Sequence, residues 1–128
     1  MNTQLLQKKY QHTSPAGAEI RMLMSNAMGG MVHCTLKDGK ISKPVTHITV
    51  NELWYVISGH GEIWRRQNKD ELVTPLYSGV TIDIPLGTDF QYRSIPGSDL
   101  VFICITMPPW PGANEVCYLN KGIWVPTE

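Results

Sequence analysis

The chain lacks long apolar runs and any excess of charge of either sign. Its 128 residues include 11 basic and 11 acidic side chains, so it has no electrostatic footprint for nucleic acid or for an anionic membrane. No apolar stretch is long enough to cross a bilayer, and residues 1–10 contain no apolar core of signal-peptide length. We therefore expect a cytoplasmic protein with no nucleic-acid or membrane partner.

Cysteines are few, and they form no metal or redox motif. Cys34, Cys104 and Cys117 are odd in number and far apart, and each lies among apolar residues. This pattern is typical of buried, inert thiols in a reducing compartment. We therefore expect all three side chains to be buried and unpaired.

Helical periodicity is also missing, and short β-like runs take its place. No segment keeps a 3.6-residue apolar period over three turns, and only residues 4–10 could form a short, weak helix. Eleven glycines and nine prolines are spread along the chain and punctuate the remaining runs. The runs predicted to be strands are 19–24, 31–36, 45–49, 53–58, 62–66, 72–77, 81–84, 90–94, 100–106 and 115–119. This rhythm predicts a single all-β domain, a sandwich or a barrel.

Alternation along the strands predicts which side chains face the interior. Alternate residues of a strand share a face, which groups Val45 with His47, and Glu52 with Trp54 and Val56. The other positions predicted to face inward are Val80, Ile82, Ile84, Phe90 and Tyr92. The positions predicted to face outward include Thr81, Asp83, Gln91 and Arg93. One imidazole and one carboxylate are therefore expected on an otherwise aromatic and aliphatic inner wall.

Two spaced motifs resemble those of the cupin superfamily. The first cupin motif is G-x5-H-x-H-x(3,4)-E-x6-G, and the matching positions here are Gly39, Val45, His47, Glu52 and Gly59. The second is G-x5-P-x-G-x2-H-x3-N, and the matching positions here are Gly79, Pro85, Gly87, Phe90 and Ser94. The resemblance implies a small single-domain cupin, a double-stranded β-helix or jelly-roll barrel. That domain would span 1–128, with the motifs over about 30–108, an N-terminal arm over 1–24 and a C-terminal loop and strand over 107–128.

The departures from these motifs concern the metal ligands. Metal-holding cupins use three histidines and one glutamate from these positions, whereas this chain keeps His47 and Glu52 and has Val45 and Phe90 in place of two histidines. His33 has the wrong parity to replace them. Because catalytic metal sites normally use three or more protein ligands, we expect no tightly bound metal and no other cofactor. A weak ion on His47 and Glu52, completed by water, remains an alternative.

Two interpretations of the surviving pair are open. In the first, His47 and Glu52 are structural and hydrogen-bond within a polar lumen. In the second, which we favour slightly, the His47 imidazole is a general base and the Glu52 carboxylate orients it. His47 and Glu52 are accordingly the predicted catalytic residues.

A second group of side chains is predicted to bind a ligand. Trp54, Phe90 and Tyr92 are expected to converge on the lumen, either as core filling or as a stacking platform with the Tyr92 hydroxyl as a polar handle. By the family pattern Arg65 points inward and could bind an anionic group. The alternative for Arg65, that it is exposed or paired with acidic residues of the following turn, is the more frequent situation.

Several functions fit these residues. The first is a metal-independent enzyme for a small polar metabolite, such as a sugar derivative, a nucleoside or a polyketide-like carbonyl compound, by isomerase, epimerase, dehydratase or lyase chemistry. The second is a non-enzymatic ligand-binding or sensor module, in which the barrel keeps its shape without the chemistry. A metal-dependent dioxygenase-like cupin is a minor alternative.

The resemblance also implies a homodimer. The region 4–24 and the outward Tyr55 and Trp64 would suit its interface. The proline-rich segment 107–112 cannot be regular sheet because proline removes ladder donors. We expect it to form a rigid loop whose Trp110 covers the mouth of the barrel.

Overall fold

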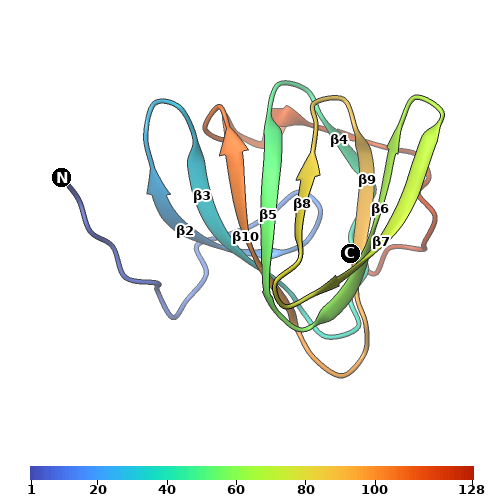
Figure 1. The fold of residues 1–128 in the computed structure, drawn as a ribbon, viewed down its shortest axis with the longest axis horizontal. Coiled ribbons are helices and arrows are strands. Elements are labelled where there is room, and N and C mark those ends of the chain that lie inside the picture. Colours follow the sequence, from blue (N-terminus) through green and yellow to red (C-terminus); the bar gives the residue numbers. More distant parts are fainter.

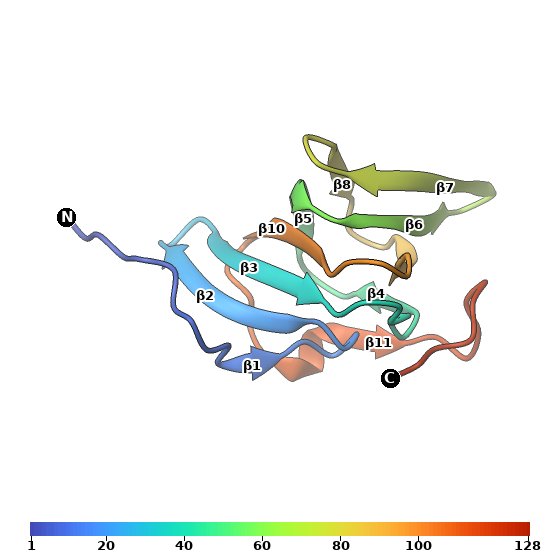
Figure 2. The same ribbon diagram turned by 90° about the horizontal axis from the view of Figure 1, so that it is seen from below.

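Two antiparallel β-sheets packed face to face make up the protein (Figures 1 and 2). The computed structural model describes residues 1–128, except for the side chain of residue 113. The larger sheet has six strands in the order β1-β2-β3-β10-β5-β8, and the smaller has five in the order β11-β4-β9-β6-β7. Among the described strands, hydrogen bonds do not close the two sheets into a barrel. The predicted all-β jelly-roll fold is confirmed, in an open form.

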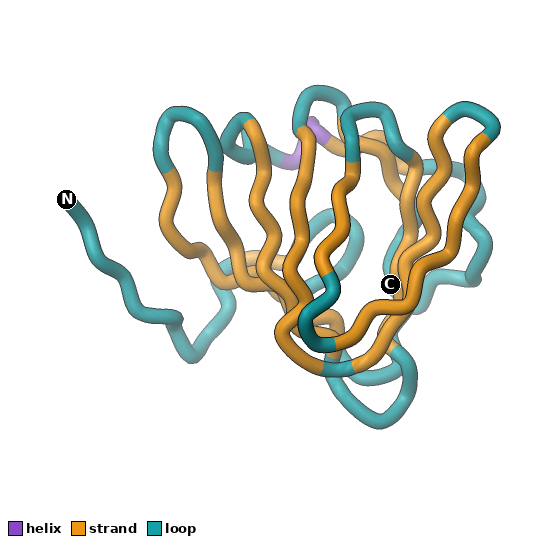
Figure 3. The backbone as a smooth tube through the Cα atoms, in the orientation of Figure 1, coloured by secondary structure: helices purple, strands orange, loops and turns teal.

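Short strands and turns account for nearly the whole backbone (Figure 3). The strands are β1 (His12–Thr13), β2 (Glu19–Ser25), β3 (Gly30–Leu36), β4 (Val45–His47), β5 (Asn51–Ser58), β6 (His60–Gln67), β7 (Asp70–Tyr77), β8 (Thr81–Ile84), β9 (Asp89–Ser94), β10 (Leu100–Met107) and β11 (Val116–Tyr118). A 3₁₀ turn, η1 (Ala113–Glu115), precedes the last strand. None of the helices described is long and apolar enough to cross a membrane.

Residues 4–10, the one segment in which a short, weak helix was possible, form an exposed arm without helix. The arm is held by the neighbouring strand β2 instead of by its own turns. Arg21 donates hydrogen bonds to the carbonyl oxygens of Gln7 and Lys8, and the amide of Gln4 donates to the carbonyl of Met22. Two carbonyl oxygens that a helix would have bonded to its own N–H groups are thus bonded by an arginine side chain of β2.

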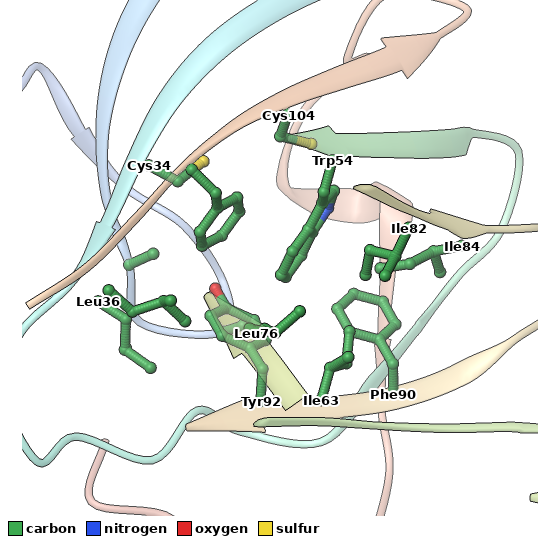
Figure 4. Close-up of a cluster of buried hydrophobic side chains, with 14 of the residues drawn as sticks. Cys34, Leu36, Trp54, Ile63, Leu76, Ile82, Ile84, Phe90, Tyr92 and Cys104 are labelled. Carbon is green, nitrogen blue, oxygen red and sulfur yellow. The ribbon is translucent and has the colours of Figure 1, made fainter. Parts of the chain in front are cut away.

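Inward-facing residues follow the predicted alternation. Exposed and buried positions alternate along β8 and along β5 as far as Ile57, with Glu52, Trp54 and Val56 on the inner face. Phe90 and Tyr92 on β9 are buried on the opposite wall. Side chains of the two sheets meet between the layers, where the Trp54 ring of β5 packs edge to face with the Tyr92 ring of β9, with ring centroids 5.0 Å apart (Figure 4). The interior is therefore dominated by aromatic rings.

One turn depends on a glycine at the junction of β5 and β6. Gly59 has a φ of +84°, a left-handed conformation that side-chain-bearing residues adopt at a cost. A Cβ added there would overlap the backbone carbonyl oxygen of Asp99. This close approach brings the β5–β6 turn against the loop that precedes β10. The lack of space for a side chain therefore explains why glycine occupies position 59, the last position of the first motif.

The outer face of the smaller sheet is covered by the C-terminal segment. The amide of Gln91 donates to the carbonyls of Ser42 and Trp124, and its oxygen accepts from the backbone N–H groups of Ile123 and Trp124. The Arg93 guanidinium lies over the Trp124 ring, 4.3 Å from its centroid. Gln91 and Arg93 face outward as predicted, yet Gln91 is fully buried beneath this segment.

Two expectations about exposure are wrong. Trp64, expected to be available for a dimer interface, is buried on this covered face, where its indole N–H donates to Glu71 and the Arg66 guanidinium lies over its ring. Cys117, expected to be buried, is exposed because it lies on the edge strand β11. Cys34 and Cys104 are buried and Tyr55 is exposed, as predicted. The homodimer itself stays a prediction.

Candidate functional site

A histidine and a glutamate face each other at one end of the jelly roll. His47 ends β4 and Glu52 lies at the start of β5, so a short turn over residues 48–50 carries the chain from one sheet to the other. Both side chains take the inward parity of their strands and are more than nine-tenths buried. The Nδ1 atom of His47 lies 3.5 Å from Oε2 of Glu52. Alternation predicted this shared face, whereas the chemical roles of the two residues stay predictions.

The Glu52 carboxylate is held from its other side by Trp54. The indole Nε1 of Trp54 donates a buried hydrogen bond of 2.8 Å to Oε1 of Glu52. Because Glu52 and Trp54 are successive inward positions of β5, the strand itself sets this pairing. One carboxylate oxygen is thereby fixed by the indole, and the other is directed toward the imidazole.

Aromatic rings enclose the imidazole of His47. The Phe90 ring meets it edge to face with centroids 5.1 Å apart, and the Trp110 ring does so at 5.3 Å. Trp110 belongs to the proline-rich loop after β10, which lies over the mouth of the site as predicted. These contacts keep the ring in one orientation, with Nδ1 toward Glu52 and Nε2 as the nitrogen left for a ligand.

A cavity of about 200 Å³ adjoins the pair. Its wall combines the N-terminal residues 14–16, strands β2, β3 and β10, and the loop that carries Trp110. The predicted residues His47, Glu52, Trp54, Phe90 and Tyr92 all line it. Most of the remaining lining is aliphatic, aromatic or sulfur-containing, so the pair is the polar end of an otherwise apolar chamber.

Arg65 is not brought to this cavity. Its guanidinium donates to the backbone carbonyl of Asp83 and to the hydroxyl of Thr74, and it lines a separate shallow hollow near the β6–β7 turn. The inward parity assigned to residue 65 does not bring it to the lumen, because the guanidinium finds acceptors on β7 and β8. Its predicted contact with a lumen ligand has no geometric support.

Burial changes the titration of three groups in the cavity wall. Desolvation, reinforced by the charge of Glu52, holds the pKa of the Cys34 and Cys104 thiols well above their usual value. Desolvation likewise raises the pKa of Tyr92 well above its usual value. The Tyr92 phenol therefore stays protonated at neutral pH and can donate a hydrogen bond.

Glu115 is a buried residue that the sequence pattern did not single out. Its carboxylate accepts hydrogen bonds from the backbone N–H and the hydroxyl of Thr49 and from the backbone N–H of Val50. Burial acts to raise its pKa, but these hydrogen bonds outweigh burial, so the pKa is lowered. Glu115 thus fixes the turn that separates His47 from Glu52. No local signal marks this role, because its partners lie more than sixty residues away.

The residues at the family's metal position do not fit a metal ion. Val45 and Phe90 stand where two histidines would be expected, and neither side chain has a lone pair to donate. Among the described residues, no group of three or more His, Cys, Asp or Glu side chains is arranged to hold a metal. The Phe90 edge also packs directly against the imidazole. The site therefore offers a metal ion only two potential ligands, His47 and Glu52, beside an aromatic wall.

Solved structures of several proteins share this architecture. Oxalate decarboxylase from Bacillus subtilis is similar with a TM-score of 0.76 and 16% identity, over 90% of this chain and 31% of that chain. KdgF from Halomonas sp. gives 0.66 and 17%, over 82% and 94%. Pac13, a nucleoside dehydratase, gives 0.69 and 12%, over 92% of both chains.

These similarities define the fold of the chain, which is that of the cupins. A Streptomyces Pac13 variant with uridine is similar over 93% of this chain, with a TM-score of 0.70. No protein-family model and no curated protein sequence matches the chain. At identities of 12 to 17%, these similarities define the fold alone.

Proposed function

We propose that the protein is a metal-independent acid–base enzyme that acts on a small molecule, by isomerase, epimerase, dehydratase or lyase chemistry. The observation that supports this most directly is the buried His47–Glu52 pair, 3.5 Å apart, at the polar end of an apolar cavity. A positioned imidazole with an orienting carboxylate is the minimal equipment for such proton transfers. That the similar Pac13 is a dehydratase agrees with the proposal.

In the proposed reaction His47 is the base and Glu52 is the orienting group. The Nε2 atom takes a proton from a carbon next to a carbonyl, and the electron pair of the broken C–H bond moves onto the carbonyl oxygen to give an enolate. Glu52 stabilises the imidazolium through Nδ1. Hydroxyl groups in the cavity wall, those of Tyr92 and Thr106, supply donors for the developing oxyanion. The imidazolium then returns a proton to carbon or to a leaving group.

Proton exchange in heavy water tests this without knowledge of the natural substrate. Neutral cyclic ketones such as cyclopentanone and cyclohexanone are incubated with the protein in D₂O, and loss of the α-proton signal is followed by NMR. We expect exchange above the buffer rate, and a decrease of at least about 100-fold in His47→Gln, within the range typical of a general base. The matched control is His60→Gln, since His60 is exposed at the start of β6, and it should keep the full rate.

Three results would contradict the proposal. These are equal exchange in His47→Gln, loss of the fold in that variant as judged by its melting temperature, and no exchange by the unmodified protein. Saturable binding of the ketones without exchange would instead support the non-enzymatic binding module.

A further inference from the structure

The cavity wall contains no fixed positive charge. Among the described residues that line it, none is a lysine or an arginine, and Glu52 contributes a carboxylate. An anion entering this chamber would lose its hydration and meet a like charge instead of a counter-ion. Burial of an unpaired charge is strongly unfavourable, as is the approach of two carboxylates.

Arginines of the neighbouring strands are already engaged elsewhere. Arg65 is bound to Asp83 and Thr74, Arg66 forms an ion pair of 2.8 Å with Asp89, and Arg93 forms one of 2.6 Å with Glu62. Each of these guanidinium groups would have to abandon its partner before it could turn toward a ligand. Arg21 lies between the lining residues Ile20 and Met22 of β2, on the other face of the strand, where it donates to the carbonyl oxygens of Gln7 and Lys8. The surrounding strands therefore do not supply the cation that the wall lacks.

Size limits the ligand as sharply as charge does. A cavity of about 150 Å³ holds a benzene ring, and the chamber beside His47 measures about 200 Å³. It thus has room for one ring and a small substituent. The aromatic edges of Phe90 and Trp110 and the flexible thioether of Met22 line this space, which suits a flat, weakly polar molecule.

Polar side chains are few in the cavity wall, and one of them, Thr106, lies directly across from Glu52 in the sheet. Besides His47 and Glu52, the hydrogen-bonding side chains of the wall include the hydroxyls of Ser14, Tyr92 and Thr106. They are enough to orient a carbonyl or a hydroxyl on a ring. We infer that the cavity takes an uncharged single-ring compound that carries one or two hydrogen-bonding groups, and that it rejects phosphates and carboxylates. This inference rests on the proposed function only for its choice of site.

Benzamide and benzoate are the probes that test the inference. They have nearly the same shape and size and differ in charge at neutral pH. We expect benzamide to bind in NMR shift titrations at least about tenfold more tightly than benzoate. Equal or tighter binding of benzoate, or no binding of either probe, would overturn the inference.

A lysine placed in the wall should remove the discrimination. Met22 lines the cavity but is partly exposed, so in Met22→Lys the new ammonium can remain hydrated at the rim. We expect this variant to bind benzoate about tenfold more tightly than the unmodified protein does. Met28→Lys is the matched control, because Met28 is exposed and does not line the cavity. An equal gain in benzoate affinity in both variants would mean that the net charge of the protein, and not the charge of the cavity wall, determines how tightly benzoate binds.

Failure of this inference can be told apart from failure of the proposed function. If benzamide binds as expected and no ketone exchanges its protons, the ligand class stands and the catalysis does not. If a ketone that carries a carboxylate exchanges as fast as cyclohexanone, the catalysis stands and the ligand class is refuted. Glu52→Gln gives an independent check, since loss of the like charge should raise the affinity for benzoate relative to that for benzamide.

Discussion

Replacement of Glu115 by glutamine should destabilise the protein far more than its position in a loop suggests. The carboxylate accepts hydrogen bonds from three donors of Thr49 and Val50 and is only 4% exposed. Hydrogen bonds to a charged group contribute about 1.5–3 kcal/mol each. Glutamine can keep its one oxygen toward the two backbone N–H groups, which both bond Oε1, and its NH₂ can donate to the Thr49 hydroxyl in place of Oε2. All three hydrogen bonds then become neutral ones that contribute about 0.5–1.5 kcal/mol, a loss of about 1 kcal/mol each.

We therefore expect Glu115→Gln to lower the free energy of unfolding by about 3 kcal/mol, a large share of the roughly 5–15 kcal/mol of a typical domain. For a chain of this length that corresponds to a fall in melting temperature of about 12 °C. Urea unfolding at pH 7, followed by tryptophan fluorescence, measures it. Asp70→Asn is the control, because Asp70 is exposed and should change stability by less than about 0.5 kcal/mol. A Glu115→Gln midpoint equal to that of the control would refute the reasoning.

The pH dependence of this effect has a definite sign. Folding lowers the pKa of Glu115, so the unfolded chain binds a proton at this residue more readily than the folded protein does. The stabilisation is therefore complete above the ordinary glutamate pKa and is lost as the pH falls through the lower, folded value. The difference in stability between the unmodified protein and Glu115→Gln should shrink as the solution is acidified. A difference that grows instead would contradict the assignment.

Two further predictions concern the turns and the thiols. Gly59→Ala should destabilise the protein by at least about 2 kcal/mol more than Gly79→Ala, because both glycines have a positive φ but only the first would bring its Cβ into backbone; equal effects in urea unfolding would contradict this. A thiol reagent such as DTNB should modify only Cys117 rapidly in the native protein, since Cys34 and Cys104 are buried with raised pKa values, and a second fast-reacting thiol would be inconsistent with the structure.

Local patterns predicted an all-β sandwich or barrel and the inward positions of His47 and Glu52, because both depend on strand alternation and turn spacing, whereas the jelly roll was implied by the resemblance of the motifs to those of cupins. The motif spacing matched His47 and Glu52 to two ligand positions of the first cupin motif, and period 2 directed them inward. The same rule correctly predicted that Phe90 and Tyr92 face inward. These features are encoded within a few residues of where they occur.

Features that depend on distant parts of the chain could not be predicted in this way. The exposure expected for Trp64 overlooked the C-terminal segment that Gln91 holds over the smaller sheet. Parity alone could not show that the acceptors for Arg65 lie on β7 and β8. The partners of Glu115 likewise come from a turn far away in sequence. In each case the deciding contact joins segments that no short window contains.

The central place of β10 in the larger sheet has a consequence for synthesis and refolding. This strand pairs with both β3 and β5, so the two earlier strands present unsatisfied facing edges until residues 100–107 have left the ribosome. Nascent chains are then exposed to intermolecular strand pairing. Native pairing must also close long loops before it gains contacts, which places this protein among slow, millisecond-to-second folders.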